Sequence, residues 1–530
     1  MIKFIFIIMS CFKLMISSSF QLNRSLRTTN SAFSIKFASS SSSRLYSSSS
    51  SSSSGRESAA VIQSSNKKNN NQDKIDLKPP KGTRDFYPDD YRLQMWLFDT
   101  WRGVAERFGF EEYDAPVLET ESLYIRKAGE EVTQQLYNFE DKGGRRLSLR
   151  PEMTPSLARM VMAKKGGLSF PLKWFSFPQC WRYERMTRGR RREHYQWNMD
   201  IWGVEGVEAE AELLSAIVTS FQDLGITSKD VGIKINSRKL LQALMKLYNV
   251  PDEKFAATCV LIDKLEKVPL EAVKDDLESL GLDMESVGKM LEALQMKKIE
   301  DFQALLGEDC EGVQDLQKLF DLAEAYDFVD WMQFDASVVR GLSYYTGVVF
   351  EAFDRQGELR AICGGGRYDR LLESFGGEVV PAVGFGFGDA VIVELLSSKG
   401  LLPDTSKGEI DAIVYPMEES LRTMAVTAAK EMRAAGMNVD VILEKKKPKW
   451  VFSRAEKMGA NAVVMFAPDE AANGEVVVKN LDKREQNTIK VDQLVPTVAN
   501  IVALDVFGED LSDGLKLDNL ESGHDKEIRN

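Results

Sequence analysis

Strand-forming segments that come in pairs are the feature that most constrains how this chain of 530 residues can fold. Val348–Phe353 and Glu358–Cys363 are rich in apolar side chains, and Asp354-Arg355-Gln356-Gly357 between them is a turn sequence. Leu172–Cys180 and Tyr195–Val204 are two further predicted strands. Because short connections join antiparallel neighbours, these segments predict a largely antiparallel sheet in an α+β fold.

Helices are predicted to flank this sheet. Apolar residues recur at helical spacing from Arg92 to Phe108, and the pattern stops at Gly109. Residues 252–328 are acidic and helical in pattern, with breaks at Pro269 and Gly281. We interpret them as a helical insertion within a domain that spans residues 79–405.

The pattern changes after a boundary near Leu402-Pro403-Asp404. From Ile410 to Val478 predicted strands and helices alternate, which is typical of an α/β domain. We assign residues 408–505 to this second domain and residues 506–530 to a polar tail. A division into two folded domains also suits the length, which exceeds what one core usually supports.

The first part of the chain has the composition of a delivery segment. Residues 1–56 contain seven Lys or Arg, no acidic residue, and serine runs at Ser39–Ser43 and Ser47–Ser54. This composition predicts an organelle presequence, directed to a plastid, a mitochondrion or both, with a linker that extends to residue 78. A merely disordered serine-rich tail is the alternative. The apolar stretch Phe4–Ile16 is short and interrupted, so we expect no membrane span.

The rare residue types exclude several kinds of chemistry. The five cysteines are scattered without a C-x-x-C pair, so they predict neither a disulfide framework nor a zinc site. Two histidines, His194 and His524, are too few for multi-histidine metal sites, and we predict no metal site built by the protein alone. The formal charge of −12 means that any nucleic-acid contact must come from local basic patches.

An arginine-rich segment is the strongest candidate for binding phosphate. No G-x-x-x-x-G-K-[ST] loop occurs, so a nucleotide would have to be held by arginines and a metal ion. The segment between two predicted strands contains six arginines: Arg182, Arg185, Arg188, Arg190, Arg191 and Arg192. Planar guanidinium groups suit phosphate oxygens, although a solvated loop is the alternative interpretation.

The residues around this segment resemble motif 2 of the class II aminoacyl-tRNA synthetases. The resemblance is carried by Phe177-Pro178-Gln179-Cys180-Trp181-Arg182-Tyr183-Glu184, followed by Gln196 and Asp200 on the next predicted strand. It implies that Arg182 holds the α-phosphate of ATP and the substrate carboxylate. Glu184 and Arg190 are then implied to orient the nucleotide.

Two further motifs resemble signatures of the histidyl-tRNA synthetases. They are Val338-Val339-Arg340-Gly341-Leu342-Ser343-Tyr344-Tyr345-Thr346-Gly347 and Cys363-Gly364-Gly365-Gly366-Arg367-Tyr368-Asp369. The resemblance implies that Arg340 is a catalytic arginine that contacts the histidine carboxylate and the α-phosphate. From the residues alone, Arg340 could equally form an ion pair with Asp335, and the glycines could form a tight turn or let a ligand approach the backbone.

The same family pattern implies a histidine pocket. Leu149-Arg150-Pro151-Glu152-Met153-Thr154 resembles the segment that binds the substrate amine. The implied histidine-binding residues are Glu152, Thr154 and Gln196 for the ammonium group, Asp200 and Tyr345 for the imidazole, and Tyr344 and Arg340 beside them. Taken singly, Glu152 could instead cap a helix and Tyr345 could be a core aromatic residue.

The resemblance covers residues 79–500 and departs from the family pattern in two places. Lys81-Gly82-Thr83-Arg84-Asp85-Phe86 resembles the family's start, and the motif 1 region up to Pro116 implies a homodimer. Motif 3 normally ends in an arginine that holds the γ-phosphate, but Val391 stands there. Asp200 replaces the glutamate of bacterial members. Both departures resemble plant-type organellar members.

The sequence therefore predicts a histidine–tRNA ligase that uses ATP with its associated Mg²⁺ and charges tRNA(His). The C-terminal domain is predicted to bind the anticodon through Lys445, Lys446, Lys447, Lys449 and Trp450, where a solvated lysine loop is the alternative. A catalytically silent relative is the competing hypothesis. It would act as a tRNA-binding module or as the regulatory subunit of an ATP phosphoribosyltransferase.

Overall fold

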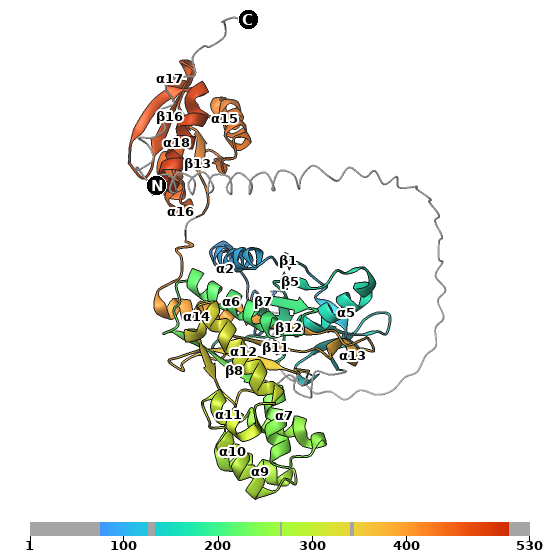
Figure 1. Cartoon of the computed structure of the whole chain (residues 1–530). Coiled ribbons are helices and arrows are strands. Elements are labelled where there is room, and N and C mark those ends of the chain that lie inside the picture. Colours follow the sequence, from blue (N-terminus) through green and yellow to red (C-terminus); the bar gives the residue numbers. More distant parts are fainter. Residues whose placement is uncertain (1–74, 126–132, 266–267, 340–343, 407, 508–530) are drawn as a thin grey trace, which may run out of the picture. The chain divides into compact units, whose positions relative to one another are not determined.

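The computed structural model describes residues 75–125, 133–265, 268–339, 344–406 and 408–507 (Figure 1). Most of the predicted presequence and linker, up to residue 74, lies outside these residues, as does the predicted polar tail from residue 508. Residues 340–343 are also outside, and they include Arg340. Among the described helices, none combines the length and the apolar composition needed to cross a bilayer.

A mixed sheet of nine strands dominates the described part of the chain before residue 400. Its order is β1 (Glu111–Glu112), β5 (Leu172–Ser176), β7 (Glu193–Trp202), β12 (Ala382–Gly388), β11 (Cys363–Arg367), β10 (Val348–Asp354), β8 (Val231–Ser237) and β9 (Met332–Phe334), and β6 (Gln179–Trp181) pairs with β7. The inner pairs are antiparallel, whereas β1–β5 and β8–β9 are parallel. The predicted α+β class is confirmed.

The predicted second strand of the hairpin, Glu358–Cys363, is wrong. The strand β11 begins only at Cys363, and residues 355–362 form a longer connection from β10. Asp354 fixes the start of this connection by accepting the backbone N–H groups of Gln356 and Glu358. Glycine has a low intrinsic strand preference, so the Gly-Gly-Gly run was not expected to be a strand. In the structure this run pairs with β10 on one side and β12 on the other.

Helices cover both faces of the sheet. The helix α2 (Pro88–Arg107) begins at a proline with Asp89 and Asp90 in its first turn, and Gly109 after it has φ 73°. Its Trp101 ring lies 5.7 Å from Trp197 of β7, in a cluster to which α6 (Glu208–Asp223) and α14 (Asp389–Lys399) also contribute. On the opposite face, α5 (Thr154–Lys164) and α13 (Leu371–Ser374) pack around Trp202.

Two smaller groups of elements accompany this sheet. A three-stranded sheet contains β2 (Leu118–Thr120), β4 (Arg146–Leu149) and β3 (Tyr137–Glu140), with α3 (Ser122–Ile125) and η1 (Lys165–Gly167) nearby in sequence. Between β8 and β9 the described chain is helical: α7 (Arg238–Leu247), η2 (Asp252–Lys254), α8 (Phe255–Ile262), α9 (Leu270–Ser279), α10 (Met284–Ala293), α11 (Ile299–Leu306), α12 (Glu311–Ala325) and η3 (Val329–Trp331). Pro269 directly precedes α9, and Gly281 follows it with φ 76°.

The C-terminal part has its own sheet and its own core. The strands are ordered β14 (Val439–Val441), β13 (Ala412–Pro416), β15 (Ala462–Phe466), β16 (Glu475–Asn480) and β17 (Gln486–Lys490). The first three are parallel, and the helices are η4 (Glu419–Leu421), α15 (Arg422–Ala434), α16 (Pro448–Met458), α17 (Pro468–Ala472), η5 (Val491–Gln493) and α18 (Leu494–Phe507). The predicted α/β character is confirmed, although sequence reasoning missed β17 and α18.

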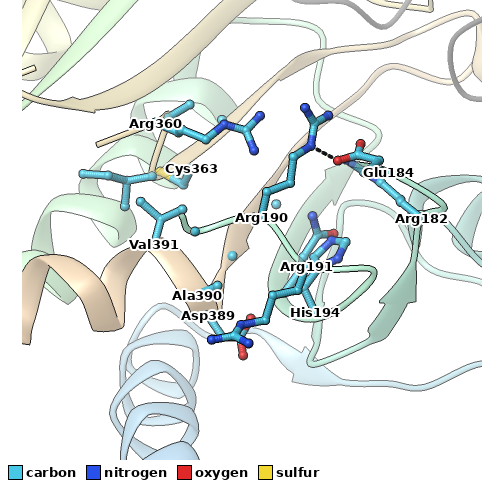
Figure 2. Close-up of a pocket in the computed structure, with 17 residues that line it drawn as sticks. Arg182, Glu184, Arg190, Arg191, His194, Arg360, Cys363, Asp389, Ala390 and Val391 are labelled. Atoms are coloured by element: carbon cyan, nitrogen blue, oxygen red, sulfur yellow. Dashed lines mark ion pairs between the residues drawn. The ribbon is translucent and has the colours of Figure 1, made fainter. Parts of the chain in front are cut away.

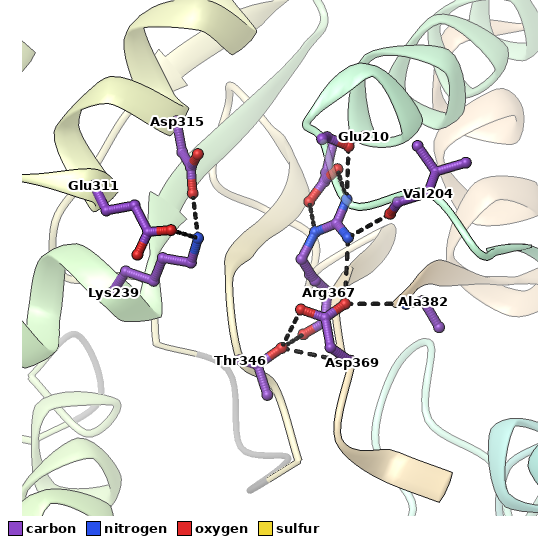
Figure 3. A network of polar contacts seen from close by, with 10 residues as sticks. Val204, Glu210, Lys239, Glu311, Asp315, Thr346, Arg367, Asp369 and Ala382 are labelled. Atoms are coloured by element: carbon purple, nitrogen blue, oxygen red, sulfur yellow. Dashed lines mark hydrogen bonds and ion pairs between the residues drawn. The ribbon is translucent and has the colours of Figure 1, made fainter. Parts of the chain in front are cut away.

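A buried ion pair ties β11 to α6 (Figure 3). The Arg367 side chain is 4% exposed and that of Glu210 is fully buried, with Arg367 Nε donating to Glu210 Oε1 at 2.7 Å. Arg367 also donates to the carbonyl oxygens of Val204 and Gly206. Its neighbour Asp369 accepts the backbone N–H of Ala382, the first residue of β12. This network joins the strands β11 and β12 to the helix that covers them.

Glu210→Gln is expected to lower the free energy of unfolding by about 3 kcal/mol, because it leaves the buried Arg367 charge without its main partner. Chemical denaturation followed by tryptophan fluorescence measures the change. Glu311→Ala is the matched control, since Glu311 is 72% exposed and pairs with Lys239 at 3.0 Å. The control should shift stability by about 1 kcal/mol at most. Equal losses in the two variants would contradict a special role of the buried pair.

Candidate active site

An arginine-lined cavity lies where β11 and β12 meet the start of α14 and the connection between β6 and β7 (Figure 2). Four arginines line it: Arg182, Arg190, Arg191 and Arg360. Of the two acidic lining residues, Glu184 forms an ion pair with Arg190. The other, Asp389, lies 2.9 Å from the guanidinium group of Arg84. Positive charge therefore exceeds negative charge around this space, which suits an anionic ligand.

Arg182 is fixed at the side of the cavity by its own backbone surroundings. Its Nε donates to the carbonyl oxygen of Pro151 at 2.9 Å, which places it beside Glu152. Burial raises the pKa of Glu152, and the nearby Arg182 charge partly opposes this rise. The structure thus brings together two predicted site residues from segments about thirty positions apart in the sequence.

His194 and Asp389 were not among the predicted site residues, yet both line the cavity. Burial, together with the charges of Arg182, Arg84 and Arg190, lowers the pKa of His194 to about 3. The imidazole is therefore neutral at physiological pH and adds no charge. Asp389 accepts the backbone N–H of Tyr195 at 3.1 Å, so it anchors the start of α14 to β7.

On one face of the paired strands β11 and β12, the residues that stand opposite each other are glycines. Gly364 and Gly366 of β11 stand opposite Gly386 and Gly384 of β12. Gly384 in turn stands opposite Asp200 of β7, and a Cβ atom there would overlap the Asp200 carboxylate. Because side chains alternate along a strand, the intervening residues Phe385 and Phe387 point into the core. A ligand can therefore approach the backbone closely over this glycine face.

A buried carboxylate borders the glycine face. The hydroxyl of Tyr368 donates to Asp200 Oδ1, whereas Oδ2 has no hydrogen-bond partner among the described residues. Burial raises the pKa of Asp200 to about 7. Gln196 stands four residues earlier on β7 and lines the cavity, so one strand links the carboxylate to the arginines. An orphaned buried oxygen of this kind indicates a missing donor.

A second buried carboxylate belongs to Glu152. Its Oε2 accepts the hydroxyl of Tyr344 at 3.1 Å, and its Oε1 has no hydrogen-bond partner among the described residues. Thr154 begins α5 two residues later and is also buried. The Tyr344 ring lies 5.1 Å from that of Tyr345 and 5.8 Å from that of Tyr368. Through these ring contacts and hydrogen bonds, Tyr344 connects the Glu152 carboxylate with Tyr368, the partner of Asp200.

Asp335, the alternative partner considered for Arg340, is already in contact with cations. Its carboxylate lies 3.4 Å from the ammonium group of Lys234 and 3.5 Å from that of Lys297. Arg340 itself lies outside the described residues, so its predicted role stays a prediction.

The predicted tRNA-binding cluster lies at the start of α16 in the C-terminal part. Trp450 is 44% exposed, with Lys446 Nζ 5.2 Å and Arg454 Cζ 5.7 Å from its ring centre. Lys445, Lys447 and Lys449 are adjacent in sequence. The cluster therefore presents cations and an aromatic face to solvent.

Comparison with known proteins decides the family. Residues 82–389 match the family model of histidyl-tRNA synthetase, and residues 411–501 match that of an anticodon binding domain. The chloroplastic/mitochondrial histidine–tRNA ligase of Arabidopsis thaliana is 55% identical over 421 residues, which are 79% of this chain and 86% of that protein. The chain belongs to the histidyl-tRNA synthetase family. It is also 38% identical to the histidine–tRNA ligase of Opitutus terrae, over 80% of this chain and 98% of that protein.

A solved histidyl-tRNA synthetase has the same fold. The crystal structure from Nostoc sp. PCC 7120 aligns with a TM-score of 0.66 and 26% identity, and it covers 81% of this chain and 100% of that chain. The histidyl-tRNA synthetase family accounts for the predicted activity, and the predicted histidine–tRNA ligase of class II, which uses ATP, is confirmed. The roles of single residues stay predictions.

Besides His194 and Asp389, sequence reasoning missed two further side chains that the structure brings to the site, Tyr368 and Arg360. Tyr368 stands in the second signature, so a role could have been suspected from its position next to the glycines. Arg360 gave no signal, because it falls in the segment that was expected to be a strand. In the structure it belongs to the connection between β10 and β11.

Asp200→Asn is expected to change how stability depends on pH. Burial raises the pKa of Asp200 from 3.8 to about 7, so between these values the folded protein holds a proton that the unfolded chain has lost. The protonated Asp200 therefore contributes fully to the free energy of unfolding below pH 3.8. This contribution falls by about 1.4 kcal/mol per pH unit as the pH rises, until the folded pKa of about 7 is passed. The variant lacks this loss. Chemical denaturation across this pH window should show the free energy of unfolding of Asp200→Asn rising relative to that of the wild type as the pH rises. A constant difference between the two proteins would contradict the raised pKa.

Proposed function

We propose that this site forms histidyl-adenylate from L-histidine and ATP and then transfers the histidyl group to tRNA(His). The observation that carries the proposal is the glycine face of β11 and β12, which runs from the Asp200 carboxylate to the arginine-lined cavity. Gln196 and Asp200 are four residues apart on β7, which is about 13 Å along a strand. This length accommodates an amino acid joined to an α-phosphate.

The histidine end of the site is proposed to lie at Asp200. Its free Oδ2 would accept an N–H of the imidazole, while Tyr368 holds Oδ1 and fixes the orientation of the short side chain. Tyr345 would meet the other ring nitrogen. An amino acid of similar shape without an N–H would leave the buried carboxylate unpaired, which costs affinity.

The ammonium group of histidine is proposed to bind near Glu152. The free Oε1 of this carboxylate, the hydroxyl of Thr154 and the side chain of Gln196 would accept its N–H groups, with Tyr344 holding Glu152 in place. A buried carboxylate that lacks a partner gains most when a cation arrives, since the ion pair offsets its desolvation.

Arg182 and Arg190 are proposed to hold ATP, with Glu184 orienting Arg190 and the nucleotide. The histidine carboxylate attacks the α-phosphorus, a C–O–P bond forms, and the bond to the β-phosphate oxygen breaks with pyrophosphate leaving. The carboxylate is already an anion, so this step needs no protein base. Negative charge accumulates on the phosphate oxygens, and Arg182 and Arg340 would stabilise it.

Mg²⁺ is proposed to enter together with ATP. The described residues contain no group of three or more His, Cys, Asp or Glu arranged to hold a metal. The two carboxylates that line the cavity are already paired with arginines. This fits an ion held chiefly by substrate phosphates, where it would neutralise their charge.

A homodimer and an organellar location are two further parts of the proposal. The dimer rests on the resemblance of the segment up to Pro116 to motif 1, and sedimentation at equilibrium would show a single-chain mass if it is wrong. The location rests on the acid-free first 56 residues and on the chloroplastic/mitochondrial name of the Arabidopsis relative. A fusion of residues 1–78 to a fluorescent protein that stays in the cytosol would refute it.

The Lys445–Lys449 cluster with Trp450 is proposed to bind the anticodon. Trp450→Ala is expected to raise the KM for tRNA(His) about tenfold, because one stacked base is typically lost. ATP–pyrophosphate exchange should not change, since activation does not use the tRNA. Lys430→Ala removes an exposed charge from α15 of the same domain and serves as the control. Equal tRNA kinetics for Trp450→Ala and Lys430→Ala would contradict the assignment.

The exchange of ATP and pyrophosphate, tested with each amino acid, separates an active ligase from a silent relative. Histidine alone should support exchange. Arg340→Lys is expected to fail nearly as badly as Arg340→Ala, by about 10²–10³ in rate, because an ammonium group cannot bridge two anions in one plane. Arg370→Ala, which removes an exposed arginine paired with Glu373, should leave the rate unchanged. Exchange by folded Arg340→Ala within a few-fold of wild type would remove Arg340 from the mechanism.

A further inference from the structure

Arg360 is a cation of the cavity whose charge the described protein does not compensate. It lies in the connection between β10 and β11, and its side chain makes neither an ion pair nor a hydrogen bond among the described residues. The other cavity arginines differ, because Arg190 is paired with Glu184 and Arg182 donates to Pro151. Arg191 alone shares the situation of Arg360 among the described lining arginines.

The direction of the Arg360 side chain indicates where an anion would sit. Figure 2 shows it extending from its own segment toward Arg190, above Val391. Two guanidinium groups that face the same space repel each other unless an anion lies between them. The nearby carboxylates of Glu184 and Asp389 already have arginine partners, so the protein's own lining acids do not meet this need.

The backbone that carries Arg360 is held in place on both sides. Ile362, two residues later, is buried and donates its backbone N–H to Ala352 of β10 at 2.8 Å. Before it, Asp354 ties down the turn through the N–H groups of Gln356 and Glu358. The backbone at Arg360 is therefore fixed at the edge of the cavity, while its exposed side chain keeps its donors available for a ligand.

Val391 explains why a cation from another segment is needed. It stands in the first turn of α14, lines the same cavity and is apolar and buried. This is the position where the motif 3 pattern has an arginine for the terminal phosphate. A valine cannot bind phosphate, so the wall formed by α14 supplies no side-chain cation at this point.

We infer that Arg360 binds the β- and γ-phosphates of ATP and the departing pyrophosphate, and so takes the place of the arginine that is absent at Val391. The inference rests on the proposed function, because it assumes that the cavity holds ATP. Arg182 borders Glu152 and the histidine end, whereas Arg360 borders Val391 on the far side of the cavity. Arg360 is thus assigned to the end of the triphosphate and not to the α-phosphate.

Arg360→Ala tests this assignment in histidine-dependent ATP–pyrophosphate exchange. The KM values for ATP and for pyrophosphate should each rise by about tenfold or more, since a hydrogen-bonded charge is lost. The KM for histidine should stay the same. In calorimetric titration the variant should lose affinity for ATP and keep its affinity for AMP. Arg360→Lys keeps the positive charge but lacks the planar guanidinium group, so its KM values for ATP and pyrophosphate should lie between those of the wild type and Arg360→Ala.

Arg355→Ala is the matched control from the same connection. Its guanidinium group is bound to the carbonyl oxygens of Ser228 at 2.7 Å and Asp330 at 3.2 Å, away from the cavity, and the variant loses the same charge. Its KM values should equal those of the wild type. Unchanged KM values for ATP and pyrophosphate in Arg360→Ala, or an equal loss of ATP and AMP affinity, would overturn the inference while the proposed function stands. Absence of exchange in the wild type would instead refute the proposed function.

Discussion

The alternation of glycine and large aromatic residues along the central strands is the constraint on which the rest of this site depends. On β12, Gly384, Gly386 and Gly388 face the side of Asp200 and the arginine-lined cavity, whereas Phe385 and Phe387 fill the core. A slip of one residue would reverse the two faces and place phenylalanine rings over the site. The aromatic packing against α2 therefore sets the register that leaves the other face bare.

Charge is distributed over this bare face according to the same logic. The carboxylates of Asp200 and Glu152 are buried, and each has one oxygen without a hydrogen-bond partner in the part of the chain that the structure describes, which is costly in the free protein. A substrate with an ammonium group and a ring N–H would satisfy both. Binding sites commonly contain residues that lower the stability of the free protein, because these residues are selected for binding the ligand.

The strands and helices around the cavity arginines are held together by ion pairs whose own arginines lie outside the cavity lining. Arg84 pairs with both Glu193 and Asp389, so β7 and the start of α14 are held together at the edge of the cavity. The Arg367–Glu210 pair does the same for β11 and α6. These structural arginines differ from Arg360, which has no such partner among the described residues. An ion pair within the protein therefore distinguishes the arginines that stabilise the fold from Arg360, which we propose to bind an anion.

The sequence by itself determined the family and the α+β class, because the signatures around Arg182 and Cys363 are contiguous and can be recognised before the fold is known. Of the residues that line the arginine-lined cavity, it named Arg182, Glu184, Arg190 and Gln196. It did not determine the register of the glycine strand, since a Gly-Gly-Gly run has little strand preference and acquires its place only by pairing with β10 and β12. For the same reason Arg360 was misplaced in a strand. Only the tertiary structure brought it beside Val391, thirty-one positions away in the chain, because a cavity assembled from separate segments has no local sequence pattern.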